Sequence, residues 1–265
     1  MTSLLNCIRS RPESVRNLVL ASALLKENAT EERIKDAIYL PGSEHRDTDH
    51  WSGNREAAVS LGLLSTNGNV LACGAANGSV ASRLDYSRTL RTAFADAFQL
   101  PGSENANLYE AYRAALGVNF ESATGATAAD DLLNAIMRRL GQGSGFNGTK
   151  LVHWRNWMEA VGLGFSAGAA FAPVPAEAIA DVLTLEITPD RMTVREFVDL
   201  LEPGVPLFED PVIAVRTFPA GVSVALYALE EDGIIDLDLV NDADEQWTLT
   251  IPHPSFSHVQ VKARS

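Results

Sequence analysis

The feature that most constrains the fold is the segment 154–165, WRNWMEAVGLGF, in which a helical pattern stops at a glycine. Its large apolar residues are spaced i, i+3, i+4 and i+7, which places them in one stripe of an α-helix: Trp154, Trp157, Met158 and Val161. Gly162 can adopt the positive φ that commonly closes a helix. The segment therefore predicts a helix that ends at a glycine and leads into a short strand, as the third helix of a winged-helix unit does.

Two upstream segments repeat this order of glutamate, alanine, an apolar pair and glycine, namely residues 56–64 (EAAVSLGLL) and 110–118 (EAYRAALGV). They fit a repeated helix-to-strand unit, but any amphipathic helix that ends at a glycine has the same pattern. A second repeat, LPGSE at 40–44 and 100–104, is best explained by the ability of Pro-Gly to end helices.

The N-terminal region reads as three helices and a hairpin. The helices are predicted from Pro12 to about Lys26, from the capping residue Thr30 to about Tyr39, and from about Ser52 to Leu61. Gly62 closes the last of these, and residues 63–72 then form a β-hairpin around an Asn-Gly reversal within the turn 65–69. This order predicts a winged helix-turn-helix.

The remaining chain is predicted to be helical first and mixed later. Helices are expected at 86–99, 108–116, 126–140, about 173–183, 222–229 and after a capping box at 193–196. The glycine-rich residues 141–145 predict a flexible linker or a tight turn. Alternating apolar and acidic residues predict strands at 234–240 and 247–251, joined by a reversal at 241–245 as a second wing.

These elements predict a mainly α protein with small β-hairpins, of the α+β class. We expect tandem winged-helix domains joined by a helical middle segment. The predicted domains are an N-terminal winged helix (1–83), a helical segment with its glycine-rich linker (84–147) and an acidic winged-helix-like domain (148–265).

Composition bounds the class of protein. A chain of 265 residues with 46% apolar content can bury real cores. The two cysteines, Cys7 and Cys73, are too few for a disulfide framework. The N-terminus lacks the pattern of a signal peptide, and the apolar runs are too short for a membrane-spanning helix, so we expect a cytoplasmic location and no membrane contact.

The charge is unevenly distributed. Residues 1–150 contain fifteen Lys/Arg and sixteen Asp/Glu, whereas residues 151–265 contain six and eighteen, which places nearly all of the net charge of −13 in the C-terminal part. DNA binding draws much of its affinity from Lys and Arg that replace counterions on phosphate. Any DNA contact is therefore expected in the N-terminal half.

Several motifs of common enzymes are missing from the sequence. It contains no phosphate-binding GxxxxGK[ST] loop, no GxGxxG after a predicted strand and no HExxH. Two polar groups could in principle bind a metal: His45, Asp47, Asp49 and His50, and the acidic set Asp236, Asp238, Asp242 and Asp244. We interpret the first as a solvated loop and the second as a charged strand surface, because neither matches a metal-ligand pattern. No catalytic residue, metal or cofactor is predicted.

The C-terminal half resembles a known family. The resemblance rests on the segment 154–165, the proline-led helix start at 173–180, and the short motifs LYAL at 226–229, GII at 233–235, NDA at 241–243 and FSHV at 256–259. In these the chain resembles the DpdG-type proteins of bacterial DNA-modification and anti-phage islands, less closely in the N-terminal winged helix. The chain is shorter in its middle and more acidic at its end. The resemblance implies association with a defence system and supplies no catalytic residues.

Two functions remain open. In the first, the chain is a non-enzymatic subunit that binds other proteins of the same operon, as acidic tandem winged-helix subunits of bacterial condensin-type complexes do. In the second, the N-terminal winged helix binds DNA or regulates transcription, through Arg46, Asn54, Arg55 and Arg83. Acidity and the scarcity of lysine favour the first, and the oligomeric state stays open.

Overall fold

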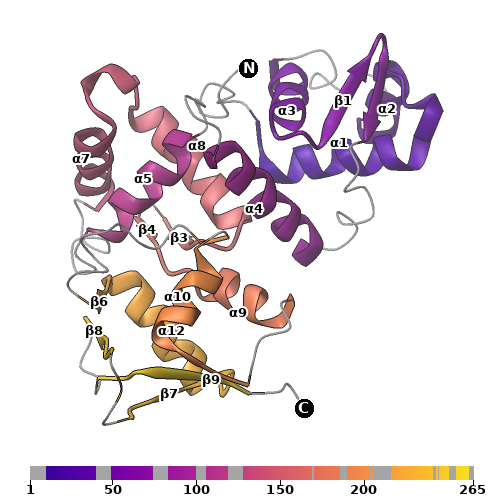
Figure 1. The fold of residues 1–265 in the computed structure, drawn as a ribbon. Coiled ribbons are helices and arrows are strands. Elements are labelled where there is room, and N and C mark those ends of the chain that lie inside the picture. Colours follow the sequence, from indigo (N-terminus) through magenta and orange to yellow (C-terminus); the bar gives the residue numbers. More distant parts are fainter. Residues whose placement is uncertain are drawn as a thin grey trace. The chain divides into compact units, whose positions relative to one another are not determined.

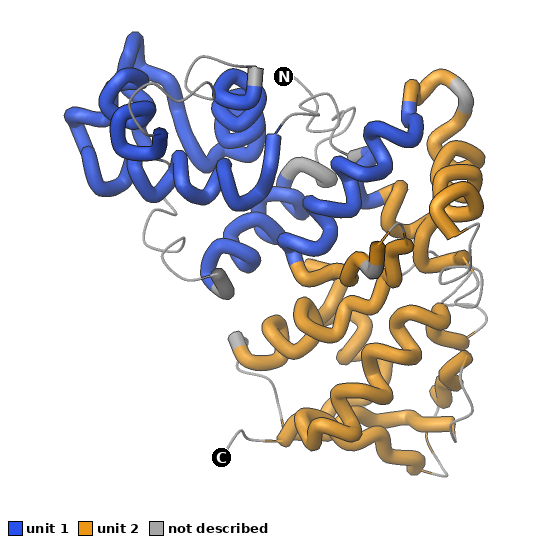
Figure 2. The backbone as a smooth tube through the Cα atoms, turned by 180° about the vertical axis from the view of Figure 1, so that it is seen from behind, with its two compact units in different colours: residues 1–109, 146–161 blue, residues 110–145, 162–265 orange. Residues whose placement is uncertain are grey.

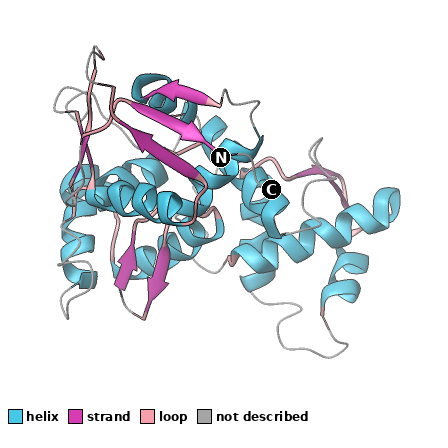
Figure 3. Ribbon diagram, turned by 90° about the horizontal axis from the view of Figure 1, so that it is seen from below, coloured by secondary structure: helices cyan, strands magenta, loops and turns pink. Residues whose placement is uncertain are grey.

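The computed structural model describes residues 10–39, 49–73, 83–99, 106–118, 128–168, 170–185, 190–202, 204–205, 216–240, 243, 245–250 and 255–262. Helices dominate, and the strands form small groups among them (Figures 1 and 3), so the α+β class predicted from the sequence is confirmed. The chain forms two compact units (Figure 2). Unit 1 comprises residues 1–109 and 146–161, and unit 2 comprises residues 110–145 and 162–265.

The first part of unit 1 has the predicted order of three helices and a hairpin. Its elements are α1 (Pro12–Leu25), η2 (Lys26–Asn28), α2 (Glu31–Ile38), α3 (Asp49–Ser60), β1 (Leu64–Asn67) and β2 (Val70–Cys73). Thr30 caps α2 by accepting a hydrogen bond from the Arg33 backbone N–H, and Gly62 has a φ of +68° after α3, both as predicted. The hairpin turn is shorter than predicted, because Asn67 already pairs with Val70.

Helices α4 (Arg83–Gln99) and α8 (Gly148–Ala160) and the start of α5 (Ala106–Leu116) complete unit 1. The predicted apolar stripe of α8 faces the core. Its four residues are all fully buried: Trp154, Trp157, Met158 and Val161. Trp154 Nε1–H donates to the backbone carbonyl of Leu108 at 3.1 Å, which joins α8 to α5.

Unit 2 contains the rest of α5 and the C-terminal elements. These are α7 (Ala128–Leu140), η4 (Gln142–Ser144), β3 (Phe165–Ala167), β4 (Ala170–Ala172), α9 (Ala176–Leu185), β5 (Arg191–Thr193), α10 (Val194–Leu201), β6 (Thr217–Phe218), α12 (Ala220–Glu231), β7 (Ile235–Asp238), β8 (Thr248–Leu249) and β9 (His258–Val261). The predicted capping box of α10 is present between Thr193 and Glu196. The predicted linker at 141–145 is a tight turn, with positive φ at Gly141 and Gly145.

The predicted second wing is wrong in its strand pairing. Strand β7 pairs with β9, which also pairs with β5, so that the antiparallel sheet has the order β5-β9-β7. Strand β8 pairs in parallel with β6 instead. The physical reason lies at Trp247, whose side chain is fully buried with its ring centroid 4.8 Å from that of Phe218. Phe218 also stacks on Phe256, which forms an isolated backbone bridge with Trp247. Burial of the Trp247 ring holds β8 next to β6.

The units also divide the chain differently from the three predicted domains. Residues 146–161 belong with the N-terminal unit, while residues 110–145 belong with the C-terminal one. The division runs through α5, at a point that has no glycine or proline to mark it. Within the described residues, no helix has the length and apolar character needed to cross a membrane.

Candidate functional site

A charged cluster joins α2 to α3 on the surface where the sequence predicts DNA contacts. Glu31 is its centre: one carboxylate oxygen accepts from the Trp51 indole N–H at 2.6 Å and lies 3.3 Å from Lys35 Nζ. The other oxygen lies 3.9 Å from Arg55 Nε. Lys35 also pairs with Glu32 and lies over the Trp51 ring, 5.2 Å from its centroid. We call these five residues the Glu31 cluster, which holds two carboxylates against two cations.

The surface of α3 is thereby left with little positive charge. Arg55, the one predicted DNA contact whose exposed side chain the structure describes, is about one-third exposed and faces Glu31. The exposed residues on the described part of α3 are Ser52 and Glu56, of which only Glu56 is charged. An exposed carboxylate repels DNA phosphate.

Asn54 is a packing residue. It is only 3% exposed, and its Oδ1 accepts a hydrogen bond from the Arg11 backbone N–H at 2.9 Å. It also hydrogen-bonds the side chain of Tyr39, whose pKa is raised mainly by burial. The predicted base contact by Asn54 conflicts with this placement, because reaching a base would break the contact that fixes the start of α1.

The other predicted residues are placed only in part. Arg46, His45, Asp47, Asp242 and Asp244 lie outside the described residues. Arg83 is the first residue of α4 and Asp49 the first of α3, but the structure does not describe the side chain of either.

Asp236 and Asp238 lie on β7, where each meets a cation. Asp236 is 2.7 Å from Lys262 Nζ, and Asp238 is 3.6 Å from an Arg191 guanidinium nitrogen. Both pairs cross the sheet, which agrees with the interpretation of this strand as a charged surface. Among the side chains that the structure describes, no three His, Cys, Asp or Glu are grouped as metal ligands would be.

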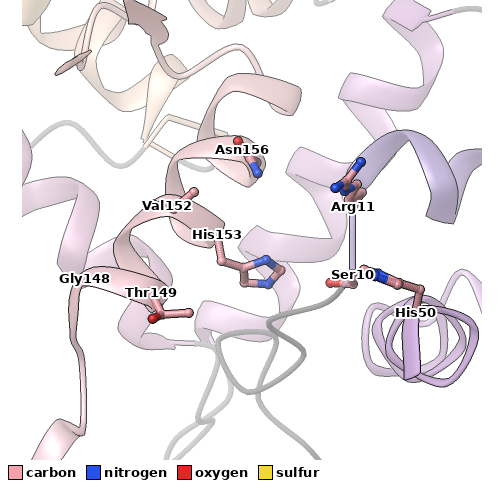
Figure 4. Close-up of a pocket in the computed structure, with 8 residues that line it drawn as sticks. All are labelled: Ser10, Arg11, His50, Gly148, Thr149, Val152, His153 and Asn156. Carbon is pink, nitrogen blue, oxygen red and sulfur yellow. The ribbon is translucent and has the colours of Figure 1, made fainter. Parts of the chain in front are cut away.

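Unit 1 also has a pocket that the sequence analysis missed. Its volume is about 490 Å³, and Figure 4 shows side chains of α8 on one side and the starts of α1 and α3 on the other. The lining residues are polar apart from Val152 and one glycine: Ser10, Arg11, His50, Gly148, Thr149, Val152, His153 and Asn156. They come from three separate stretches of sequence, so no local motif marks them.

His153 is held in one tautomer by the core. It is 4% exposed, and its Nε2 lies 3.1 Å from the indole N–H of Trp157 one turn later. Because an indole N–H can only donate, Nε2 must be the acceptor, and a neutral ring then has its proton on Nδ1. The ring projects from α8 into the pocket (Figure 4).

Comparison with known protein families identifies the chain. The model of the DpdG-like family matches residues 2–243, which is most of the sequence. The chain belongs to the DpdG-like family. No match was found among the curated proteins, and none among the solved structures.

Membership of the DpdG-like family confirms the resemblance seen in the sequence and corrects its extent. The match includes the N-terminal helices and hairpin, where the sequence suggested only a loose similarity, and it ends at residue 243. The FSHV motif at 256–259 therefore lies outside the matched region. The family suggests an association with DNA-modification and defence islands.

Proposed function

We propose that this protein is a non-enzymatic subunit of a bacterial multi-protein complex, of the anti-phage defence type, and that it acts through protein–protein contacts made by winged-helix units. Its partners are other proteins of the same operon. Membership of the DpdG-like family supports the defence setting. The three-helix and hairpin order of unit 1 supports a winged helix there, and a winged helix can bind either protein or nucleic acid.

The observation that carries this proposal is the Glu31 cluster. A recognition helix that binds DNA needs cations available to phosphate or base edges. On α3 the described cation Arg55 lies beside a carboxylate, and Asn54 is buried. A surface ion pair at this distance is weak. Glu31 therefore lowers the positive potential around Arg55 but does not fix the Arg55 side chain in place. The helix is therefore better suited to a protein partner than to a duplex.

The absence of enzymatic activity is part of the proposal. The sequence lacks the phosphate-binding loop of nucleotide hydrolases, and its GxSxG stretch at 164–168 lies in the β3–β4 hairpin instead of at the strand-to-helix turn that presents a catalytic serine. The acidic residues described on β7 are engaged with Lys262 and Arg191.

The alternative is a DNA-binding protein or transcription regulator that uses the N-terminal winged helix. What favours it is the near-neutral charge of residues 1–150 beside the strongly acidic remainder. If this alternative is correct, the fragment 1–80 should bind duplex DNA more tightly than the full chain does, because removal of the acidic part lifts a long-range repulsion.

A fluorescence-anisotropy titration with labelled duplex DNA separates the two functions. The full chain, Arg55→Ala, Glu31→Gln and the fragment 1–80 are compared at low and moderate ionic strength. We expect no saturable binding by the full chain or the fragment even at low salt, where the electrostatic contribution is greatest. Binding by the full chain that Arg55→Ala weakens would overturn the proposal in favour of DNA.

Glu31→Gln and its control Glu56→Gln test whether the Glu31 cluster is what prevents DNA binding. Both remove one carboxylate from this surface, but only Glu31 faces Arg55. If the Glu31 cluster suppresses DNA binding, weak salt-sensitive binding should appear in Glu31→Gln and stay smaller in Glu56→Gln. Equal gains in both variants would mean that overall charge, and not the cluster, is responsible.

A further inference from the structure

The pocket of unit 1 has the chemistry of an anion site, which the proposed function does not use. Arg11 lines it with an exposed, positively charged side chain, and His50 adds an imidazole. None of the eight lining residues is acidic, although the chain has 34 Asp/Glu and a net charge of −13. We propose that this pocket binds a small phosphate monoester.

Neutral donors complete the lining. Thr149 and Asn156 are exposed on α8 and offer a hydroxyl and an amide. The neutral His153 ring, with its Nε2 occupied by Trp157, has its proton on the other nitrogen. Phosphate oxygens accept several hydrogen bonds at once, and guanidinium donors suit them best because two N–H groups can engage two oxygens together.

The backbone adds to this preference. Arg11 directly precedes α1, His50 is the second residue of α3, and Gly148 and Thr149 are the first residues of α8. Three helices thus begin at the pocket (Figure 4). The helix dipole places partial positive charge at each of these helix starts. This charge favours a phosphate over a neutral ligand.

The size of the pocket indicates more than a bare ion. A volume of about 490 Å³ lies within the range typical of small-molecule sites and exceeds what one phosphate group fills. Val152, which is 50% exposed, supplies an apolar contact beside the polar groups. A phosphate with an organic substituent, such as a nucleoside monophosphate, matches both parts. The same phosphate chemistry occurs at the end of an oligonucleotide, so the test includes both sources.

Isothermal titration of the full chain with four probes tests the proposal: AMP, adenosine, inorganic phosphate and a 5′-phosphorylated oligonucleotide. We expect AMP to bind in a saturable manner, phosphate to bind more weakly, and adenosine not to bind. Arg11→Gln should weaken AMP binding by roughly tenfold or more, since it removes a charge-assisted hydrogen bond. The Arg11 side chain is exposed, so this variant should keep the fold, which circular dichroism checks.

Arg33→Gln is the matched control. It removes the same charge from an exposed position of α2 that does not line the pocket, and should leave AMP affinity unchanged. Thr149→Val, which removes a neutral donor, should weaken binding without a change of charge. Equal losses in the Arg11 and Arg33 variants, equal binding of AMP and adenosine, or binding of the oligonucleotide alone would each overturn the proposal. These outcomes are separate from those of the duplex titration, because a small-ligand site is compatible with either function.

Discussion

Replacement of Gly221 by alanine should destabilise unit 2. Gly221 is the second residue of α12 and is buried against Pro173, which directly follows β4. A Cβ atom built on it would lie 2.1 Å from the carbonyl oxygen of Pro173 and 3.1 Å from the carbonyl carbon. Because the obstacle is backbone, no side chain can rotate away, and the helix or the loop must move.

Two opposing effects set the magnitude. Alanine favours helix over glycine by up to about 1 kcal/mol in a helix interior, and by less in the first turn. Overpacking of a well-packed site costs about 1 to 3 kcal/mol, and relief of a contact this short needs a shift near the upper end of that range. We therefore expect a net loss of about 1 to 3 kcal/mol in the free energy of unfolding, or a fall in Tm of several degrees for a chain of this length.

Urea unfolding followed by tryptophan fluorescence measures this loss. The matched control is Gly148→Ala at the first residue of α8, where an added Cβ would have no neighbour within 4 Å. The control should keep its stability or gain less than about 1 kcal/mol. A Gly221→Ala variant as stable as Gly148→Ala would refute the close approach of α12 to Pro173.

Three further predictions concern single groups. Tyr112→Phe should lower the free energy of unfolding by about 1 to 2 kcal/mol in the same urea assay, because the fully buried hydroxyl donates to the Leu163 carbonyl at 2.7 Å. The pKa of Glu196 is lowered by hydrogen bonds from the Thr193 backbone N–H and hydroxyl, so its stabilising effect is present above the ordinary pKa of 4.5 and lost as the pH falls through the folded value. The stability difference between the wild type and Glu196→Gln should therefore shrink on acidification, and a difference independent of pH would contradict this. The purified protein should show no metal-dependent DNA cleavage or nucleotide turnover, and an activity that Asp236→Asn abolishes would show that β7 has been misinterpreted.

Local patterns were the part of the fold that the sequence could predict. Helix boundaries followed from capping residues and glycine stops, as at Thr30 and Gly62, because these signals act within a few residues of the backbone that they satisfy. The buried face of α8 could also be predicted, because four large apolar residues at helical spacing lie on one side of the helix and are buried together.

Pairings between distant segments were not predictable in the same way. Alternation identified β7 and the strand after Trp247 but gave no partner for either, and the nearest strand in sequence was the wrong choice. The correct pairing depends on β9 and on an aromatic cluster in which Phe218 contacts both Trp247 and Phe256, whose positions in sequence carry no shared signal. The division into units depends likewise on packing between α8 and α4, as between Trp157 and Phe94.

The candidate site shows the same limit. Arg55 was predicted as a DNA contact of α3, but Glu31, which lies beside it in the fold, comes 24 positions earlier in the sequence and lowers its value as such a contact. Asn54, one residue before it, faces the core. Helical position alone could have separated the two, since consecutive residues point in directions about 100° apart. The pocket lined by Arg11, His50 and His153 required the fold itself.

The most direct test of the proposed function is purification of the tagged full chain from its bacterial host with its operon neighbours expressed, followed by nuclease treatment and mass spectrometry. A protein-binding subunit should retain proteins of the same operon in fixed proportion after nucleic acid is removed. Recovery of the chain alone, or loss of every partner on nuclease treatment, would contradict a role based on protein–protein contacts.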